Sequence, residues 1–141
     1  MSAYDPGASG WRAMSAAALP SGLGVPWAKR VDGHWQYGLQ TGSDHGNPSG
    51  VLHGGVLLAF ADHALSLLAW EAAERSVCTT IQLNSHFRDA ARPGEFLELR
   101  GEVTRRTHGL VFLRGMVGAR DVAGIKDVAA IDGIWRVLRQ R

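Results

Sequence analysis

A stretch of about twenty residues, from Gly54 to Ala73, constrains the fold more than any other part of this 141-residue chain. Its periodicity predicts a helix, and apolar side chains cover almost the whole circumference of that helix. A helix of this kind has no face suited to water, so other elements must cover it. The segments on either side therefore have to supply a layer that wraps around one long helix.

One strand is predicted before this helix and four strands are predicted after it. Alternating apolar and polar side chains, together with β-branched residues, indicate strands over residues 34–40, 77–87, 96–105, 110–120 and 125–138. Turns that contain glycine or proline separate the last three strands from those before them. An antiparallel sheet of about five strands wrapped around one central helix predicts an α+β domain.

A single domain is expected over residues 34–141. Apolar residues make up 45% of the chain and charged residues 20%, which is typical of a globular protein. The preceding segment, residues 1–33, is rich in Ala, Gly, Ser and Pro. Within it, Gly10–Leu19 is compatible with a short helix that Pro20 would end.

Charge and hydropathy exclude several classes of partner. The net charge is +2 and the basic residues are scattered, so no nucleic-acid partner is expected. A membrane span over the apolar helix would place Asp62 near its centre, at a cost of about 2.5–3.5 kcal/mol. The N-terminus lacks a basic start followed by an apolar core, and the single Cys78 excludes an internal disulfide. We therefore expect a cytoplasmic protein with no membrane partner.

Asp62 is the residue that most strongly suggests chemistry, because an ionised carboxylate among apolar side chains needs a partner. It could be a structural acid with a hydrogen bond in the core. His63 points about 100° away on a helix, which argues against a metal ion bound by both residues. The remaining interpretation is a general base or nucleophile in a site of low dielectric constant.

Gly54 and Gly55 open the helix, where backbone N–H groups have no partner within the helix. These amides could bind an anion, or a carbonyl oxygen that gains charge during acyl transfer. A simple tight turn is the alternative interpretation. Gly54 and Asp62 are eight residues apart, which is roughly 12 Å along a helix. If both groups act on one carbonyl, the site must therefore be built between two subunits.

The pattern Asn47-x-x-Gly50-x-x-His53-Gly54-Gly55, followed by Asp62, closely resembles the hotdog-fold acyl-CoA thioesterases, in particular the phenylacetate-pathway (PaaI-like) branch. The similarity covers roughly residues 34–138. It implies a hotdog fold, hydrolysis of an acyl-CoA substrate, and an assembly that is at least a homodimer, with a homotetramer expected. It implies no metal ion and no separate cofactor, because CoA arrives as part of the substrate.

The resemblance also implies a role for each matching residue. Asp62 would be the nucleophile or the base that activates water, and the Gly54 amide would polarise the thioester carbonyl. His53 and Asn47 would orient the thioester and the water or leaving group. Thr80, on the strand after the helix, would hold the water from the same subunit as Asp62.

The CoA phosphates would lie near basic side chains at the subunit boundary, and Arg88, Arg105 and Arg106 are the candidates. Two other functions remain open. Hotdog proteins include hydratases and dehydratases, although no second polar pair has the spacing of their sites. The chain could also be an acyl-CoA-binding protein without turnover, although such a protein has no need of Asp62, His53 and Asn47 together.

Overall fold

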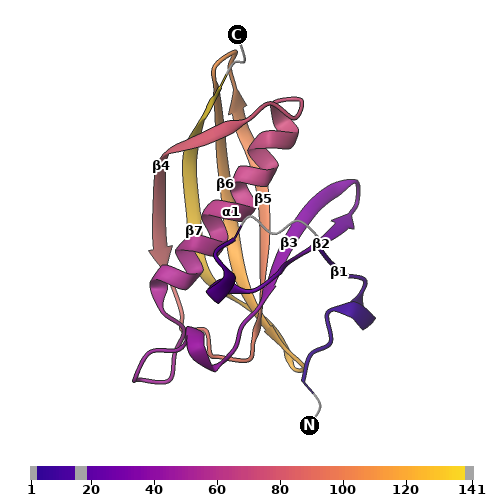
Figure 1. Cartoon of the computed structure of the whole chain (residues 1–141), viewed down its shortest axis with the longest axis vertical. Coiled ribbons are helices and arrows are strands. Elements are labelled where there is room, and N and C mark those ends of the chain that lie inside the picture. The colour runs from indigo at the N-terminus through magenta and orange to yellow at the C-terminus, as the bar shows by residue number, and fades with distance from the viewer. Residues whose placement is uncertain (1–2, 15–18, 139–141) are drawn as a thin grey trace.

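The computed structural model describes residues 3–14 and 19–138, and in it one long helix lies across an antiparallel sheet (Figure 1). The helix α1 spans Gly54–Ala72, and the strands are β1 (Arg12–Ala13), β2 (Pro26–Val31), β3 (His34–Gln40), β4 (Cys78–Phe87), β5 (Phe96–Arg106), β6 (Leu110–Asp121) and β7 (Gly124–Val137). Short 3-10 helices lie at Gly7–Ser9, Ser21–Leu23 and Ser43–His45. The predicted α+β fold is confirmed.

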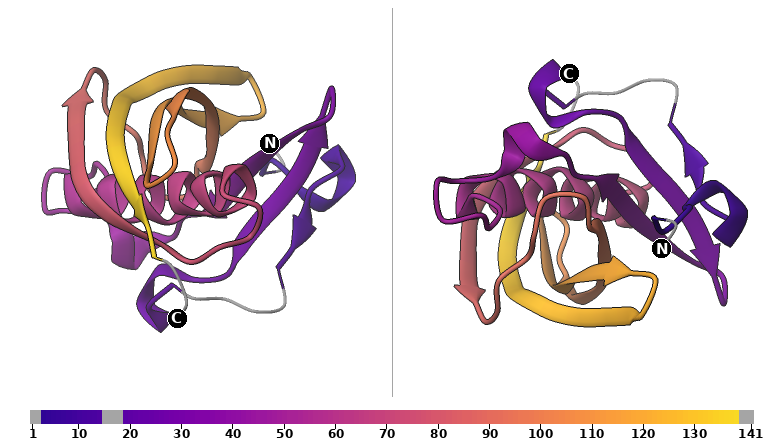
Figure 2. Two further views of the ribbon diagram at one scale, coloured as in Figure 1. Left: turned by 90° about the horizontal axis from the view of Figure 1, so that it is seen from above. Right: turned by 90° about the horizontal axis from the view of Figure 1, so that it is seen from below.

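The described strands form one sheet in the order β1-β2-β3-β5-β6-β7-β4. Figure 2 shows this sheet curving around α1 in both end views. The sheet has seven strands rather than the expected five or so, because β1 and β2 extend it beyond β3. β4 forms the opposite edge, where it pairs with β7 alone.

The helix predicted over Gly10–Leu19 is not formed where the structure describes that segment. Arg12–Ala13 is instead the strand β1, which pairs with β2. The Met14 N–H then donates to the Pro26 carbonyl at 2.9 Å, so pairing with β2 satisfies backbone groups that a helix would have used. Residues 15–18, where the prediction continues, lie outside the described residues.

The core lies between α1 and the inner face of the sheet. Its fully buried side chains include Phe60 and Leu65 from α1, and Leu97, Val117 and Trp135 from the strands. Glycines on β5 and β6 allow α1 to approach these strands closely. A Cβ atom at Gly101 of β5 would lie 2.8 Å from the Leu68 side chain, and one at Gly115 of β6 would lie 3.2 Å from Leu65. The face of α1 away from the sheet is only half-buried, so the described residues of one chain do not cover the helix as completely as its sequence predicts.

An aromatic cluster covers the outer face of the sheet over β2, β3 and β5. The buried Phe96 ring contacts Tyr4, Trp11 and Trp27, with ring centroids 5.5, 5.1 and 6.4 Å away. Gly38 lies directly beneath this ring, and a Cβ atom there would come within 2.2 Å of Phe96. Because Gly38 has no side chain, the Phe96 ring can lie against the sheet at this point. The N-terminal residues Tyr4 and Trp11 then pack on that ring.

Replacing Gly38 by alanine should lower the free energy of unfolding by about 1–3 kcal/mol, because the Phe96 ring must move in a packed site. Urea denaturation followed by fluorescence measures this change. Gly109→Ala is the matched control, since a Cβ atom there meets nothing within 4 Å. Equal stability of the two variants would contradict the packing role of Gly38.

Candidate active site

Asp62 and Thr80 are in direct contact. Asp62 is half-buried in the middle of α1, and Thr80 lies near the start of β4. The Thr80 hydroxyl donates a hydrogen bond to Asp62 Oδ1 at 2.6 Å. The carboxylate therefore has the partner that its apolar surroundings demand, and the two residues form one half of the candidate site.

A β-bulge directs the Thr80 side chain toward α1. The pairing of β4 with β7 shifts register between Thr80 and Gln82, so Ile81 is the extra residue. Half-buried side chains lie on both sides of the bulge, at Thr80 and Leu83, whereas Ile81 is exposed. Bulges re-aim side chains in this way, and here the effect is to bring a hydroxyl group onto Asp62.

Two further residues that the sequence analysis did not assign to the site are connected to this pair. Ser66 lies one helical turn after Asp62, and its hydroxyl is 3.4 Å from the Thr80 hydroxyl. The indole N–H of the buried Trp135, on β7, donates to Ser66 at 2.8 Å. The i,i+4 spacing from Asp62 was the available signal for Ser66, whereas Trp135 had none.

Asn47 holds the loop that precedes α1. Its side-chain oxygen accepts hydrogen bonds from the N–H groups of Ser49 and Val51, at 2.9 and 3.3 Å. Its backbone N–H also donates to the Val51 carbonyl at 2.8 Å. Within the described residues its Nδ2 group makes no hydrogen bond, so this amide is the part of Asn47 that can contact a bound molecule.

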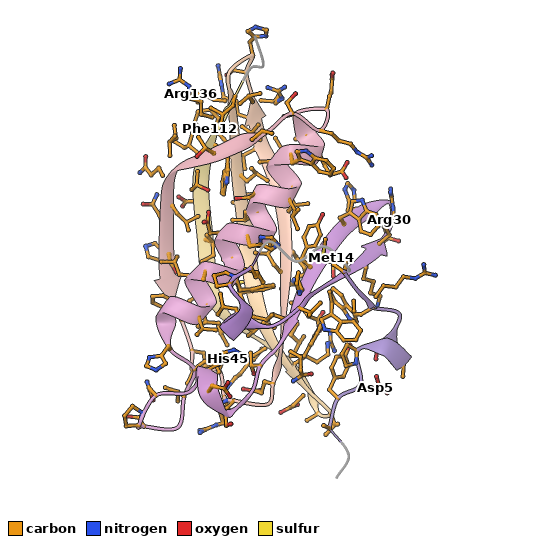
Figure 3. The ribbon with its side chains drawn as sticks, viewed as in Figure 1. Asp5, Met14, Arg30, His45, Phe112 and Arg136 are labelled. Carbon is orange, nitrogen blue, oxygen red and sulfur yellow. The ribbon has the colours of Figure 1, made fainter. Side chains whose placement is uncertain are left out.

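His45, which the sequence analysis left out of the site, is a buried structural residue of the same loop (Figure 3). Its Nδ1 accepts from the Gly42 N–H at 3.0 Å, so its other nitrogen donates to the Gly22 carbonyl at 2.8 Å. The His45 carbonyl accepts the N–H of His53 at 3.0 Å. The imidazole of His45 thus fixes the loop, and the backbone of His45 positions His53.

The start of α1 presents unpaired amides beside His53. The N–H groups of Gly54 and Gly55 have no acceptor within the described residues, and the His53 side chain is exposed. The Phe87 ring lies over Gly54, where an added Cβ atom would be 3.2 Å from it. Asn47, His53 and Gly54 therefore form a second half of the candidate site, at the Phe87 end of β4.

The two halves are separated within one chain. α1 is continuous over Gly54–Ala72, so Gly54 and Asp62, which differ by eight positions, lie about 12 Å apart along its axis. One subunit cannot place the Gly54 amide and the Asp62 carboxylate on the same carbonyl group. This separation agrees with the distance expected from the sequence.

The predicted basic residues do not lie together. Arg88 follows the end of β4, whereas Arg105 pairs with Phe112 at the other end of the sheet. Figure 3 shows Phe112 and Arg136 at the end opposite His45. Arg106 donates to the carbonyl of Ala72, the last residue of α1, at 3.2 Å. Arg88 and the Arg105–Arg106 pair of one chain cannot contact the same phosphate.

His63, next to Asp62, has different surroundings. Burial lowers the pKa of His63, and the nearby charge of Asp62 opposes this shift. Its Nε2 atom is buried and has no hydrogen-bond partner within the described residues. Among residues 3–14 and 19–138, no group of three or more His, Cys, Asp or Glu side chains could hold a metal ion.

Residues 49–121 match the family model described as the thioesterase superfamily. The chain belongs to the thioesterase superfamily. The match includes His53, Gly54, Asp62 and Thr80, and it covers more than half of this superfamily member. A comparison with curated protein sequences gave no significant match.

Solved structures place this superfamily member among hotdog proteins. A phenylacetic acid degradation-related protein of Ralstonia eutropha is 26% identical, with a TM-score of 0.70 over 82% of this chain and 86% of that one. A Bacillus halodurans protein crystallised with CoA is 23% identical, with a TM-score of 0.70 over 81% and 74%. A hexameric hotdog-fold thioesterase of Campylobacter jejuni is 19% identical, with a TM-score of 0.66 over 72% and 80%. The hotdog fold and the likeness to the phenylacetate-pathway branch are confirmed.

Proposed function

We propose that this thioesterase-superfamily member hydrolyses acyl-CoA thioesters at sites that are each shared between two subunits. The observation that carries the proposal is the hydrogen bond from Thr80 to Asp62, which holds the side-chain carboxyl group of Asp62 in a half-buried position. A carboxylate held in this way can act as a base or as a nucleophile. The structure of a CoA-bound relative supports the same substrate class, and that of a hexameric relative supports assembly into an oligomer.

The unpaired edge of β4 supports the pairing of subunits. Val77, Ile81 and Phe87 are large exposed apolar residues on this strand or just before it. An exposed edge strand with apolar side chains is suited to pairing with another chain. If two β4 strands pair in antiparallel fashion, the Thr80 end of one lies beside the Phe87 end of the other. Asp62 and Thr80 of one subunit then face Gly54, His53 and Asn47 of its partner.

In the shared site, the Gly54 N–H would donate to the thioester carbonyl oxygen, where negative charge develops. When Asp62 acts as base, it takes a proton from water as the water oxygen attacks the carbonyl carbon. The carbon–sulfur bond then breaks, and the proton passes to the CoA thiolate. When Asp62 acts as nucleophile, an acyl-enzyme anhydride forms first, CoA leaves, and water hydrolyses the anhydride. Both routes give the free acid and CoA.

The positions of the arginines suggest how CoA would lie across the boundary. When two β4 strands pair in antiparallel fashion, Arg88 of one subunit lies at the same end of the paired strands as Arg105 and Arg106 of the other subunit. We therefore propose that the CoA phosphates contact arginines from both subunits. This assembly is at least a homodimer, and a homotetramer remains a prediction.

A panel of acyl-CoA substrates tests the activity, with release of CoA followed by a thiol-detecting reagent. Aromatic, medium-chain and hydroxylated acyl groups should be compared, and we expect kcat/KM of about 10⁴ M⁻¹s⁻¹ or more for the best substrate. Tight binding without release of thiol would indicate an acyl-CoA-binding protein. Loss of the double bond of an enoyl-CoA without thiol release would indicate a hydratase. Either result would overturn the proposal.

A further inference from the structure

Side chains from three elements converge on the Thr80 hydroxyl. Thr80 on β4 is the direct register partner of Trp135 on β7, so both side chains lie at one level of the sheet. Ser66, from α1, lies between them: it accepts from the Trp135 indole at 2.8 Å and is 3.4 Å from Thr80. The hydrogen-bonded series therefore runs from Trp135 through Ser66 and Thr80 to Asp62.

The chemistry of Trp135 sets the direction of this series. An indole N–H can only donate, so the Ser66 oxygen is an acceptor and its single proton is free for another contact. The Thr80 hydroxyl already donates its one hydrogen bond to Asp62, at 2.6 Å. The contact of 3.4 Å can therefore only be a donation from Ser66 to Thr80. Every hydroxyl proton in the series points toward the carboxylate.

The fold makes room for this arrangement at Gly133. A Cβ atom there would lie 2.8 Å from the Trp135 ring and 2.6 Å from the Gln82 carbonyl oxygen. Any other residue at this position would collide with the ring or with β4. The missing side chain lets the indole lie across β7, where its N–H reaches Ser66.

We propose that Ser66 and Trp135 are positioning residues, which act through Thr80 to keep its hydroxyl group donating to Asp62 and one oxygen lone pair open for the attacking water. The Thr80 oxygen has two lone pairs, of which Ser66 uses one. The other can accept a hydrogen bond from water beside Asp62, so the water is held next to the group that activates it. This inference rests on the proposed thioesterase function.

Ser66→Ala is the first test. We expect kcat for the best acyl-CoA to fall about 3- to 10-fold, the effect of losing one hydrogen bond, with KM unchanged. The acidic limb of the kcat–pH profile should move to higher pH, because Thr80 becomes a weaker donor to the carboxylate. Ser66→Thr keeps a hydroxyl group and should restore both kcat and the profile to within about twofold of wild type.

Ser85→Ala is the matched control. Ser85 lies on the same strand as Thr80, and its hydroxyl is buried without a hydrogen-bond partner within the described residues. The substitution removes the same atom as Ser66→Ala but breaks no hydrogen bond. We expect kcat and the pH profile of this variant to match those of the wild type.

Trp135→Phe tests whether the indole N–H is what makes Ser66 donate to Thr80, because the substitution keeps an aromatic ring but removes the N–H donor. Combined with Ser66→Ala, it should lower kcat no further than Ser66→Ala alone, since both changes interrupt one series. If Trp135→Phe does not fold, the Ser66 variants decide the matter by themselves.

Two results would overturn the inference while leaving the proposed function intact. One is an unchanged kcat and pH profile in Ser66→Ala while Asp62→Asn is inactive. The other is a lower kcat in Ser66→Ala with an unmoved acidic limb and no recovery in Ser66→Thr, which would indicate a packing role. Full activity of Asp62→Asn is a different outcome, because it would overturn the proposed function itself and the inference with it.

Discussion

Replacing Asp62 by asparagine should reduce kcat for acyl-CoA hydrolysis by at least about 100-fold, the scale of losing a positioned acid–base group. The amide has nearly the shape of the carboxylate and can still accept the hydrogen bond that Thr80 donates. It can neither take a proton from water nor attack a carbonyl carbon. The variant should therefore remain folded and assembled while losing its chemistry, which steady-state kinetics and size-exclusion chromatography measure together.

Asp132→Asn is the matched control for this experiment. Asp132 is an exposed residue of β7 that accepts a hydrogen bond from the Asn84 side chain at 2.7 Å, so the same change of charge occurs away from α1. We expect this variant to keep the wild-type kcat. An Asp62→Asn enzyme as active as the control would show that the carboxylate has no part in hydrolysis.

Mixing two inactive variants should restore activity. In pure Asp62→Asn or pure His53→Ala oligomers, every shared site lacks one group. In a hybrid dimer, one site carries both substitutions and the other carries neither. Random pairing makes about half of the dimers hybrid, so the mixture should reach about one quarter of wild-type activity. Coexpression of the two chains with different affinity tags allows both kinetic measurements: the unfractionated mixture should reach about one quarter of wild-type activity and the purified hybrid about one half.

A second hybrid supplies the control. Asp62 and Thr80 contact each other within one subunit, so a hybrid of Asp62→Asn with Thr80→Val contains no intact site. This combination should be no more active than the mean of its two parents. If the Asp62→Asn and His53→Ala hybrid shows the same lack of recovery, the site is not shared in the proposed way.

Most of the sheet could be predicted from the sequence because its strands have two different faces. The predicted bounds of β3 to β7 agree with the structure to within one residue, and α1 ends one residue earlier than expected. β2 was not predicted because its alternation is weak. Its Trp27 contributes to the outer aromatic cluster, while Ala28 packs against the inner core, so apolar residues occur on both faces.

The site was predictable to a different degree at each residue. Asp62 stands out because a carboxylate in an apolar helix is costly, and Gly54 because paired glycines open that helix. The contact of Asp62 with Thr80 was expected from the family resemblance alone. Trp135 reaches Ser66 across 69 residues of sequence, and only strand register and the gap at Gly133 bring the two together. No pattern within a short stretch of sequence predicts such a contact.

The groups behind Asp62 have one more property in common. Two hydroxyl groups and an indole form the series, and none of them gains or loses a proton near neutral pH. An imidazole in the place of Thr80 would gain a positive charge and a second N–H donor as the pH fell, and the surroundings of the carboxylate would change with it. With hydroxyl groups in that place, Asp62 keeps the same neighbour in the same protonation state across the physiological range. The hydrogen-bond donor to Asp62 is therefore the same group at every pH in that range.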